Sequence, residues 1–185
     1  VDLPRHFGFL TRWQIVGPFD NREKKGFAVV YRPEVKLDLK ARLKGQLGPV
    51  RWQPSSTDQD YVVLDIAKTI KPYKGAVMYA TTSFTIDEAR DIELRLGTPN
   101  AWKLWLNGRL LFAREEYHRG MILDQYRVPG RLKTGINTIL LKVCQNEQAE
   151  DWAQRYQFQL RVCDASGIAV PPSKPARGGK TGAQP

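Results

Sequence analysis

The sequence predicts an all-β protein that folds as an antiparallel β-sandwich with little helix. Apolar and polar residues alternate most clearly along Ile92–Leu96, Ile139–Val143 and Phe158–Val162. A period of two is typical of strands with one face in the core and the other in solvent. Asn107-Gly108 lies between two apolar runs, as expected for a tight type I′ hairpin turn. No segment has the pattern of a long helix, so nine or ten short strands favour two packed sheets over a closed barrel.

The remaining strands are expected from β-branched and aromatic runs. The longest of these runs is Ala76–Ile86, and shorter ones occupy Trp13–Val16 and Tyr61–Ile66. The stretch Val35–Lys44 also alternates, with its basic residues on one side, although a helical turn would fit the same residues. Trp102–Phe112 contains the Asn-Gly turn and is expected to form a hairpin.

We expect one domain, because 185 residues can bury a sufficient core in a single unit. Residues 1–9 are expected to be a lead-in, residues 10–167 the sandwich, and residues 168–185 a flexible, basic tail rich in Pro and Gly. The sequence contains no apolar run of the ~20 residues that a membrane helix requires, so no membrane span is expected.

The two cysteines, Cys144 and Cys163, are expected to be unpaired. If the strands that end in them form a hairpin, the two residues lie about six rungs apart, or roughly 20 Å at ~3.3 Å per residue. A disulfide needs its Cα atoms within about 7 Å. Both thiols are therefore predicted to pack as small hydrophobic side chains.

Strand direction predicts which loops share an end of the sandwich. If successive strands from Asp91 onward are antiparallel neighbours, the tight turns at Asn107-Gly108 and 133–135 lie at one end. The longer connections 97–101, 114–123 and 144–155 then gather at the other end. Long loops on a rigid scaffold commonly carry binding residues, so this loop end is the predicted functional surface.

Three short motifs stand out between Trp13 and Gly167: the GPF turn at 17–19 within WQIVGPFDN, WLNG at 105–108 and NTILLKV at 137–143. In their order and spacing they resemble the galactose-binding-domain-like jelly-roll modules of large, planctomycete-type bacterial multidomain proteins. The resemblance implies a noncatalytic accessory domain, often read as carbohydrate-binding, that is extracellular or associated with the cell envelope. Many relatives carry a Ser-Asp-Asp-Gly type of turn before the WLNG strand, whereas residues 98–101 here are Thr-Pro-Asn-Ala.

Seven residues at the loop end are the candidate glycan-binding residues. A sugar site requires a flat apolar face for the ring and polar groups for the hydroxyls. The candidates for these two roles are Trp102, Tyr117 and Trp152 for the face, and Arg114, His118, Arg119 and Asn146 for the polar groups. Trp102 shares the parity of Leu104 and Leu106, which favours a core position, and Trp13, Trp52 and Trp105 are also expected to be structural.

The sequence contains few residues in patterns typical of catalysis, so no catalytic residue and no enzymatic activity are expected. The only two histidines are His6 and His118, and no common hydrolase or metalloprotease motif is present. The sequence allows two catalytic arrangements, a dyad of Cys144 with His118 and a carboxylate pair of Glu116 with Asp151, and it favours neither. No metal site or cofactor is expected, apart from the option of a structural calcium ion held by loop oxygens.

The net charge of the chain indicates which class of binding partner to expect. The formal net charge is +10, and without Lys174, Arg177 and Lys180 of the tail it is +7. This favours an anionic partner, and together with the resemblance it predicts a module for acidic or sulfated polysaccharide. The alternative is a structural domain that binds neighbouring domains of a larger polypeptide and no sugar. Nucleic-acid binding is not favoured, because the sequence has no RNA-recognition, KH or zinc-finger signature.

Overall fold

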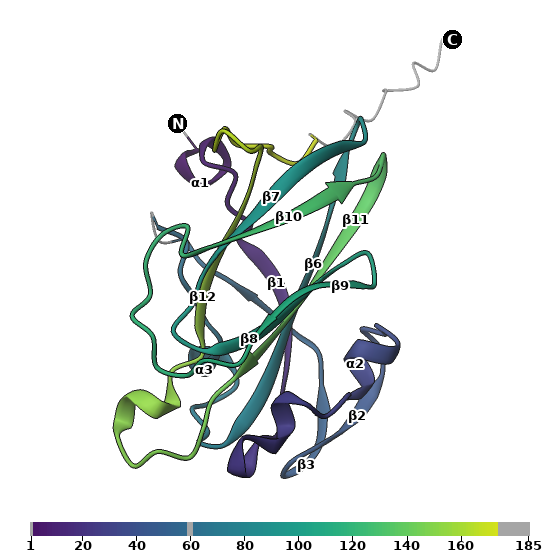
Figure 1. Cartoon of the computed structure of the whole chain (residues 1–185). Coiled ribbons are helices and arrows are strands. Elements are labelled where there is room, and N and C mark those ends of the chain that lie inside the picture. Colours follow the sequence, from purple (N-terminus) through teal and green to yellow (C-terminus); the bar gives the residue numbers. More distant parts are fainter. Residues whose placement is uncertain (1, 59–60, 174–185) are drawn as a thin grey trace, which may run out of the picture.

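The computed structural model describes residues 2–58 and 61–173 and confirms the antiparallel β-sandwich (Figure 1). Its larger sheet has six strands in the order β4-β1-β6-β11-β8-β9. In chain order these strands are β1 (Arg12–Asp20), β4 (Gln53–Ser56), β6 (Ala76–Ile86), β8 (Ala101–Leu106), β9 (Arg109–Arg114) and β11 (Gly135–Cys144). The long run expected at 76–86 is β6, which lies between β1 and β11.

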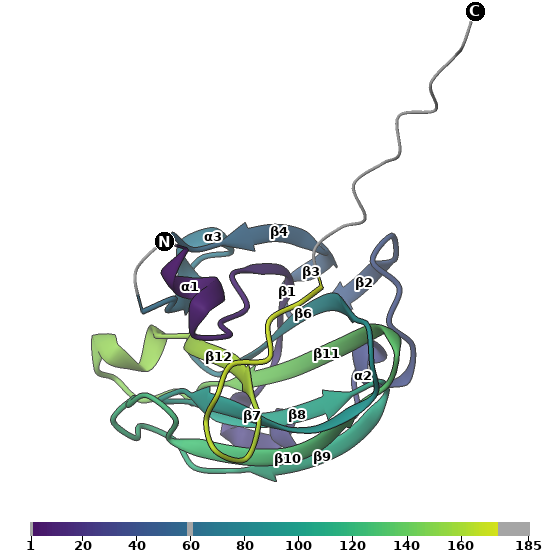
Figure 2. The ribbon, with the colours of Figure 1, turned by 90° about the horizontal axis from the view of Figure 1, so that it is seen from above.

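The smaller sheet has four strands in the order β10-β7-β12-β5. Its members are β5 (Leu64–Asp65), β7 (Arg90–Gly97), β10 (Tyr126–Leu132) and β12 (Gln157–Cys163). From β4 to β12 the chain alternates between the two sheets, except at the β8–β9 hairpin, and such crossing connections are typical of jelly-roll sandwiches. The two sheets face each other, and β9 and β10 run along the same side of the sandwich (Figure 2).

The Asn-Gly hairpin forms as predicted. Asn107 and Gly108 both have positive φ, 52° and 81°, which is the requirement of a type I′ turn. Asn107 Nδ2 donates a hydrogen bond of 2.9 Å to Asn137 Oδ1, and Asn107 Oδ1 accepts one of 2.9 Å from the Thr138 amide. The turn is therefore fixed to the start of β11.

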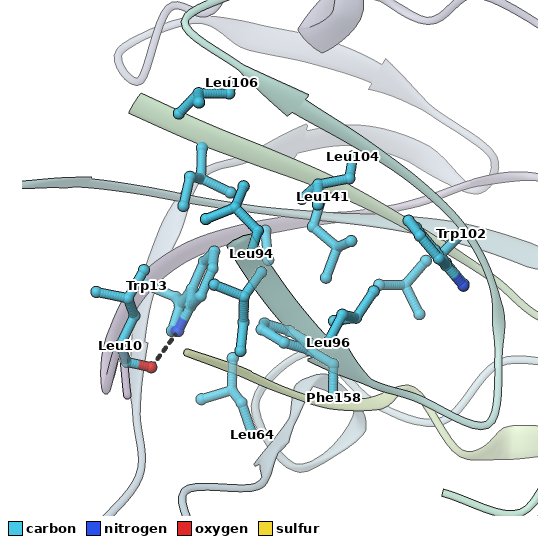
Figure 3. Packing of buried hydrophobic residues seen from close by; sticks show 14 of the residues in the cluster. Leu10, Trp13, Leu64, Leu94, Leu96, Trp102, Leu104, Leu106, Leu141 and Phe158 are labelled. Carbon is cyan, nitrogen blue, oxygen red and sulfur yellow. Dashed lines mark hydrogen bonds between the residues drawn. The ribbon is translucent and has the colours of Figure 1, made fainter. Parts of the chain in front are cut away.

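The main core lies between the two sheets and contains the alternating residues that the period-two pattern assigned to the interior. Trp102, Leu104 and Leu106 all point into it, which confirms the parity argument for β8 (Figure 3). Trp13 donates its indole N–H to the carbonyl of Leu10 at 2.9 Å, so this buried polar group is satisfied.

The outer face of the larger sheet is also buried. It is covered by η1 (Arg22–Phe27), α2 (Arg32–Val35) and a separate two-stranded sheet of β2 (Arg42–Gly45) and β3 (Gly48–Arg51). The second cluster of buried hydrophobic residues lies under this covering segment, residues 21–52, and comprises Val16, Phe19, Phe27, Leu43, Trp52, Val77, Tyr79, Ala101, Trp105, Leu140 and Cys144. The central strands are therefore apolar on both faces.

Lys142, near the end of β11, anchors the covering segment. Its ammonium group donates hydrogen bonds to the carbonyls of Phe27 at 3.1 Å and Val29 at 2.7 Å, and pairs with Glu34 Oε1 at 2.8 Å. The side chain of Lys142 is 0% exposed and that of Glu34 is 6% exposed. Tyr79 donates its hydroxyl to the same Glu34 oxygen, and burial raises the pKa of Tyr79, so the phenol remains a donor.

The expected lead-in and tail both contact the sandwich. At the N-terminus, α1 (Leu3–His6) precedes Phe9, which forms a bridge with Arg161 of β12. Beyond residue 167, where we expected flexibility to begin, the Val170 amide donates to the Val162 carbonyl at 2.9 Å and the Val170 side chain is buried. The packed chain thus extends to at least residue 173, while residues 174–185 lie outside the described residues.

Cys144 and Cys163 are both buried free thiols, as predicted. The hairpin assumed for that prediction does not form, however, because β11 pairs with β6 and β8 whereas β12 pairs with β7 and β5. The two thiols therefore belong to different sheets. This is the same crossing pattern that places consecutive strands on opposite sides of the core.

Two expected strands are shorter than their sequence patterns. Only Leu64–Asp65 of the run at 61–66 forms a strand, because the Asp65 carboxylate caps the Ala67 amide at 3.0 Å and starts the short helix α3 (Ile66–Thr69). Within 35–44, the helical turn of α2 ends at Val35 and strand β2 begins only at Arg42. Leu37 and Leu39 are exposed between them, so the alternation there does not mark a core face.

We predict that Lys142→Met lowers the free energy of unfolding by about 3–5 kcal/mol, because Glu34 would remain buried without its cation. Urea unfolding at neutral pH measures the change. The double variant Lys142→Met/Glu34→Leu should recover most of the loss, since it removes both charges. Lys44→Met, at an exposed position of β2, is the matched control and should change stability by less than about 0.5 kcal/mol. A loss no larger than that of the control would contradict the anchoring role.

Candidate functional site

The three long connections meet at one end of the sandwich, as predicted from strand direction. The Arg119 amide donates to the Pro99 carbonyl at 3.2 Å, which joins the connection after β9 to the one after β7. Asn100 Nδ2 donates to the Arg155 carbonyl at 2.7 Å, which joins the latter to the connection before β12. The strands involved lie in alternate sheets rather than side by side, but their directions still reverse at each connection.

Tyr117, His118 and Asn146 lie together on the side of the loop end that faces η1. His118 Nε2 and Asn146 Oδ1 are 2.7 Å apart, and the Tyr117 hydroxyl accepts a hydrogen bond of 3.1 Å from Asn21 Nδ2. Lys24 Nζ lies 5.3 Å from the centroid of the Tyr117 ring. Three of the predicted residues are thus neighbours, but their polar atoms and the face of Tyr117 already have protein partners.

Arg114 and Arg119 are brought together by a single carboxylate. Glu116 Oε2 accepts from Arg114 Nε at 2.7 Å, and Glu116 Oε1 pairs with Arg119 Nε at 2.9 Å. Both guanidinium groups are about half exposed, so the pairs are of the weak surface type and each guanidinium keeps donors for a ligand.

Trp102 does not contribute to the predicted face, and the prediction for Trp152 lies outside the side chains that the structure describes. Trp102 is 0% exposed and belongs to the main core, so its ring is not available for stacking on a sugar. Trp152 lies in η2 (Asp151–Gln154), and its side chain is outside the described part of the chain.

Buried amides that we did not single out in the sequence organise the loop end. Asn21 Nδ2 donates to the Gln145 carbonyl at 2.8 Å and Asn21 Oδ1 accepts from the Phe27 amide at 3.0 Å. Gln145 Nε2 donates to the Arg155 carbonyl at 3.1 Å. These amides satisfy backbone groups that the sheets leave unpaired, so they serve the loops rather than a ligand. Asn21 and Gln145 each lie in a connection between strands, and no pattern in the sequence indicates which backbone groups they bind.

A second group of side chains lies on one side of the sandwich, at the edge strands β9 and β10, and extends from the buried Trp102 to the exposed Phe112 and Arg114. Phe112 of β9 and Tyr126 of β10 both contact Trp102, with ring centroids 5.5 and 4.9 Å apart respectively. The guanidinium carbon of Arg114 lies 5.9 Å from the Tyr126 centroid. We call Trp102, Phe112 and Tyr126 the aromatic group, and the surface along the neighbouring edges of β9 and β10, on which Phe112 is exposed, the side groove.

A β-bulge in β9 determines what faces the side groove. The pairing register with β8 shifts between Leu104 and Trp105, which pair with Phe112 and Leu110 respectively and leave Leu111 as the extra residue. Three residues of β9 lie opposite inward-facing residues of β8: Arg109 pairs with Leu106, Phe112 with Leu104, and Arg114 with Trp102. Leu111 packs against the main core. In a regular strand, odd and even residues point to opposite sides, so Phe112 and Arg114 would lie on the other side from Arg109 and Leu111. The extra residue of the bulge brings all four to the same side.

The aromatic group contains two polar atoms without a hydrogen-bond partner among the described residues. These are the indole nitrogen of Trp102 and the hydroxyl of Tyr126, and both atoms are buried. The Trp102 nitrogen is turned away from the leucine side chains of the core (Figure 3). A buried donor without an acceptor costs about 1–3 kcal/mol, so each calls for a partner such as a water molecule or a ligand oxygen. Phe112, which is 46% exposed, is the member of the group most open to solvent.

Asp124 holds the connection between β9 and β10 against the outer face of the smaller sheet. Its carboxylate accepts hydrogen bonds from Arg95 Nη1 at 2.9 Å and Arg161 Nε at 2.7 Å. The two arginines lie opposite each other on β7 and β12. The hydrogen bond and charge of Arg161, with those of Arg95, lower the pKa of Asp124 despite the opposing effect of burial. This contact fixes the chain two residues before Tyr126, the first residue of β10.

The residues considered for catalysis and metal binding are arranged for other roles. Burial raises the pKa of the Cys144 thiol to about 12, so little of the reactive thiolate forms at neutral pH. Glu116 is engaged by two arginines. Among the described residues, no three His, Cys, Asp or Glu side chains are grouped so that they could hold a metal ion. None of the helices in that part of the chain is long and apolar enough to span a membrane.

No protein-family model matches the sequence, and none of the curated proteins is similar to it. Among solved structures, the fold is similar to part of the β-glucosidase from Kluyveromyces marxianus. The glucose complex of that enzyme has 15% identity and a TM-score of 0.37, over 49% of this chain and 11% of the enzyme. Its selenomethionine-labelled form has 11% identity and a TM-score of 0.46, over 82% of this chain and 16% of the enzyme. The chain thus spans less than a fifth of the enzyme's length, and a likeness at this level assigns no activity.

We predict that Asp124→Asn lowers the free energy of unfolding at neutral pH by about 2–3 kcal/mol, because charged hydrogen bonds to two arginines are weakened. The folded-state pKa of Asp124 is below the ordinary value of about 3.9, so its stabilising contribution is complete above that pH. It is lost as the pH falls through the folded-state pKa. Urea unfolding at several pH values should therefore show wild type and variant converging in acid.

The matched control for this prediction is Asp91→Asn. Asp91 pairs with Arg131 at 2.8 Å, but both side chains are exposed, so the expected loss is below about 1 kcal/mol. A difference between wild type and Asp124→Asn that stays constant from pH 7 to pH 2.5 would contradict the assigned role of the carboxylate.

Proposed function

We propose that the chain is a noncatalytic glycan-binding module whose site is the side groove at the aromatic group. The observation that carries the proposal is the pair of unpartnered buried polar atoms, Trp102 Nε1 and the Tyr126 hydroxyl, in two rings that contact each other, with the half-exposed ring of Phe112 against Trp102. An aromatic face beside hydrogen-bonding groups is the combination that a sugar ring requires. The sequence resemblance to galactose-binding-like modules supports the same class of function and an extracellular or cell-envelope location.

Arg114 provides the charge of the proposed site. Its guanidinium group lies beside Tyr126 and shares Glu116 with Arg119. Arginine presents several N–H donors in a fork that matches carboxylate and sulfate oxygens. Together with the net positive charge of the chain, this supports an acidic or sulfated polysaccharide as ligand.

The expected affinity is modest. One stacked ring and two or three hydrogen bonds contribute about 1 kcal/mol each, against the cost of immobilising the ligand, which gives dissociation constants in the micromolar to millimolar range. Such affinity suits a module that acts by proximity to a polymer surface, where several weak contacts add.

We predict that Phe112→Ala and Arg114→Ala each weaken glycan binding about tenfold, since they remove the exposed stacking face and a charged donor. A glycan array probed at low and high salt identifies the ligand, and calorimetry then compares the variants, with thermal unfolding as the check on folding. Leu110→Ala is the matched control, because Leu110 is equally exposed on β9 but pairs with the outward-facing Trp105.

The variant Tyr117→Ala distinguishes glycan binding at the side groove from glycan binding at the loop end. Tyr117 lies with His118 and Asn146 on the η1 side, so its removal should leave binding within about twofold. Binding that depends on Tyr117 but not on Phe112 would refute the side groove. No binding to any glycan, or binding abolished by high salt and indifferent to both rings, would refute the glycan function.

A second candidate function, an assembly domain without a sugar ligand, is supported by the covering segment. It exposes six aliphatic side chains within 19 residues, namely Val29, Val30, Val35, Leu37, Leu39 and Leu47. Val30 and Leu47 are 63% and 70% exposed. Exposed apolar side chains that form one patch commonly mark a protein contact, and the assembly candidate requires these six to form such a patch.

The assembly candidate predicts that backbone amides of residues 29–47 exchange hydrogen more slowly when the contact is made. Hydrogen exchange is compared between this chain alone and the intact gene product. Slower exchange confined to these residues, and relieved by Val30→Asp, supports assembly. Identical exchange in both forms would contradict it.

A further inference from the structure

The β2–β3 hairpin of the covering segment has one buried face and one exposed face. Leu43 belongs to the second cluster of buried hydrophobic residues and Val50 packs against that cluster, so both side chains point toward the larger sheet. Arg42, Lys44 and Arg51 are their immediate neighbours in sequence and are exposed. Because side chains alternate along a strand, these three cations point to solvent from the same face.

The exposed face brings like charges together. Arg42 and Arg51 are register partners, and Lys44 follows Arg42 on the same side of β2. Like charges directly opposite each other on neighbouring strands destabilise their pairing. None of the three side chains forms an ion pair or a hydrogen bond within the described chain. An anionic partner would relieve this repulsion.

The positive charge extends beyond the hairpin. Residues 32–51 contain six exposed basic side chains, namely Arg32, Lys36, Lys40, Arg42, Lys44 and Arg51. The same range contains two acidic residues, Glu34 and Asp38. Glu34 is already paired with the buried Lys142, and the Asp38 carboxylate accepts a hydrogen bond of 3.0 Å from the Lys40 amide. The exposed charge of this range is therefore positive and unbalanced.

The turn of the hairpin carries an exposed leucine. Gln46 and Leu47 form the turn between the register partners Gly45 and Gly48. The Gln46 amide donates to the Pro18 carbonyl at 2.8 Å, which fixes the turn to β1. Leu47 is 70% exposed, although tight turns mostly contain Gly, Pro, Asn, Asp or Ser. Its side chain therefore buries little surface within the chain and is available to a partner.

A hollow joins the hairpin to residues 30–32. The side chains that line it include Phe19, Val30, Tyr31, Arg32 and Lys44. Val30 is 63% exposed. Asp20 also lines the hollow, but its carboxylate is paired with Arg22 at 2.6 Å. Exposed aliphatic and basic side chains thus lie beside each other at this hollow.

A lipid surface is the partner that uses both kinds of side chain. A polysaccharide or a nucleic acid would contact the cations but gain little from Leu47 and Val30. Protein contacts are dominated by Trp, Tyr and Arg, whereas Leu and Val are under-represented in them. In a bilayer, anionic headgroups attract basic side chains, and aliphatic side chains enter the boundary between headgroups and acyl chains.

We propose that this surface, which we call the hairpin face, binds a membrane surface that contains anionic phospholipids. The hairpin face comprises Val30, Arg32, Arg42, Lys44, Leu47 and Arg51. Leu47 and Val30 enter the boundary of the acyl chains, and the four basic side chains contact lipid phosphates. This partner goes beyond the glycan and assembly functions proposed above and depends on neither of them.

The test is cosedimentation of the chain with lipid vesicles. Binding to vesicles of phosphatidylcholine and phosphatidylglycerol, in a ratio of about 7:3, should be at least about tenfold tighter than to phosphatidylcholine alone. Leu47→Asn should weaken binding to the anionic vesicles about tenfold, because it removes an aliphatic side chain from the lipid boundary. Leu110→Asn, at an exposed position of β9, is the matched control and should leave binding within about twofold.

A pair of double variants separates the hairpin face from the net charge of the chain. Arg42→Gln/Arg51→Gln should weaken binding to the anionic vesicles about tenfold or more. Arg127→Gln/Lys133→Gln removes the same charge from exposed positions of and beside β10, and should change binding by no more than about twofold. Thermal unfolding checks that every variant is folded.

The outcomes distinguish a failure of this inference from a failure of the proposed functions. No preference for anionic vesicles, or equal losses in the two double variants, would overturn it and leave the glycan function untouched. Normal binding by Leu47→Asn would overturn it as well, because charge alone would then suffice. If amides of residues 42–51 exchange hydrogen more slowly in the intact gene product but not on anionic vesicles, the occupant is a protein domain and the lipid partner is refuted.

Discussion

One buried ion pair, between Lys142 in the centre of the larger sheet and Glu34 in the covering segment, fixes how the chain is wrapped around its sheets. The Lys142 side chain emerges among Leu140, Cys144 and Tyr79 on a face that is apolar, where an isolated ammonium group would be far too costly. Two backbone carbonyls and Glu34 take all three of its protons. A covering segment that buried Lys142 without placing Glu34 beside it would leave the ammonium group without a counter-ion, so the pair favours the observed arrangement.

A second charged contact acts in a similar way on the other side of the sandwich. Asp124, bound by Arg95 and Arg161, holds the long connection between β9 and β10 on the outer face of the smaller sheet. Both outer faces are therefore covered at defined places. No comparable contact covers the side with β9 and β10 among the described residues, and the bulge in β9 places Phe112 and Arg114 on that side. Function is thus proposed where the fold leaves an edge uncovered, rather than at its most elaborate loops.

The sequence predicted those features that depend on local patterns. Alternation placed Trp102, Leu104 and Leu106 in the core, and Asn107-Gly108 formed its turn because few other dipeptides adopt positive φ twice. The convergence of the long connections followed from strand direction, which is also local. The assumption that consecutive strands are neighbours was wrong, because the chain crosses between sheets, and crossing depends on contacts far apart in sequence.

The candidate site could be predicted only in part. Trp102 and Arg114 were named, and they are register partners across the β8–β9 hairpin. Phe112 was missed because the bulge reverses its parity, and Tyr126 was missed because it comes from the other sheet. The alternating pattern predicts that Lys142 faces solvent, because nothing in the local sequence indicates that residues 21–52 cover that face of the sheet. These misses share one cause: each depends on a tertiary contact that leaves no periodic signal.

The most direct measurement is the NMR signal of the Trp102 indole N–H during a titration with oligogalacturonate. This buried donor has no protein partner in the described chain and lies behind the proposed stacking face, so it reports on the site from within. We predict a progressive shift of this signal together with the amides of β9 and β10, and little change at Tyr117 or His118. Shifts confined to the loop end around Tyr117, with the Trp102 signal unchanged at saturation, would contradict a glycan site in the side groove.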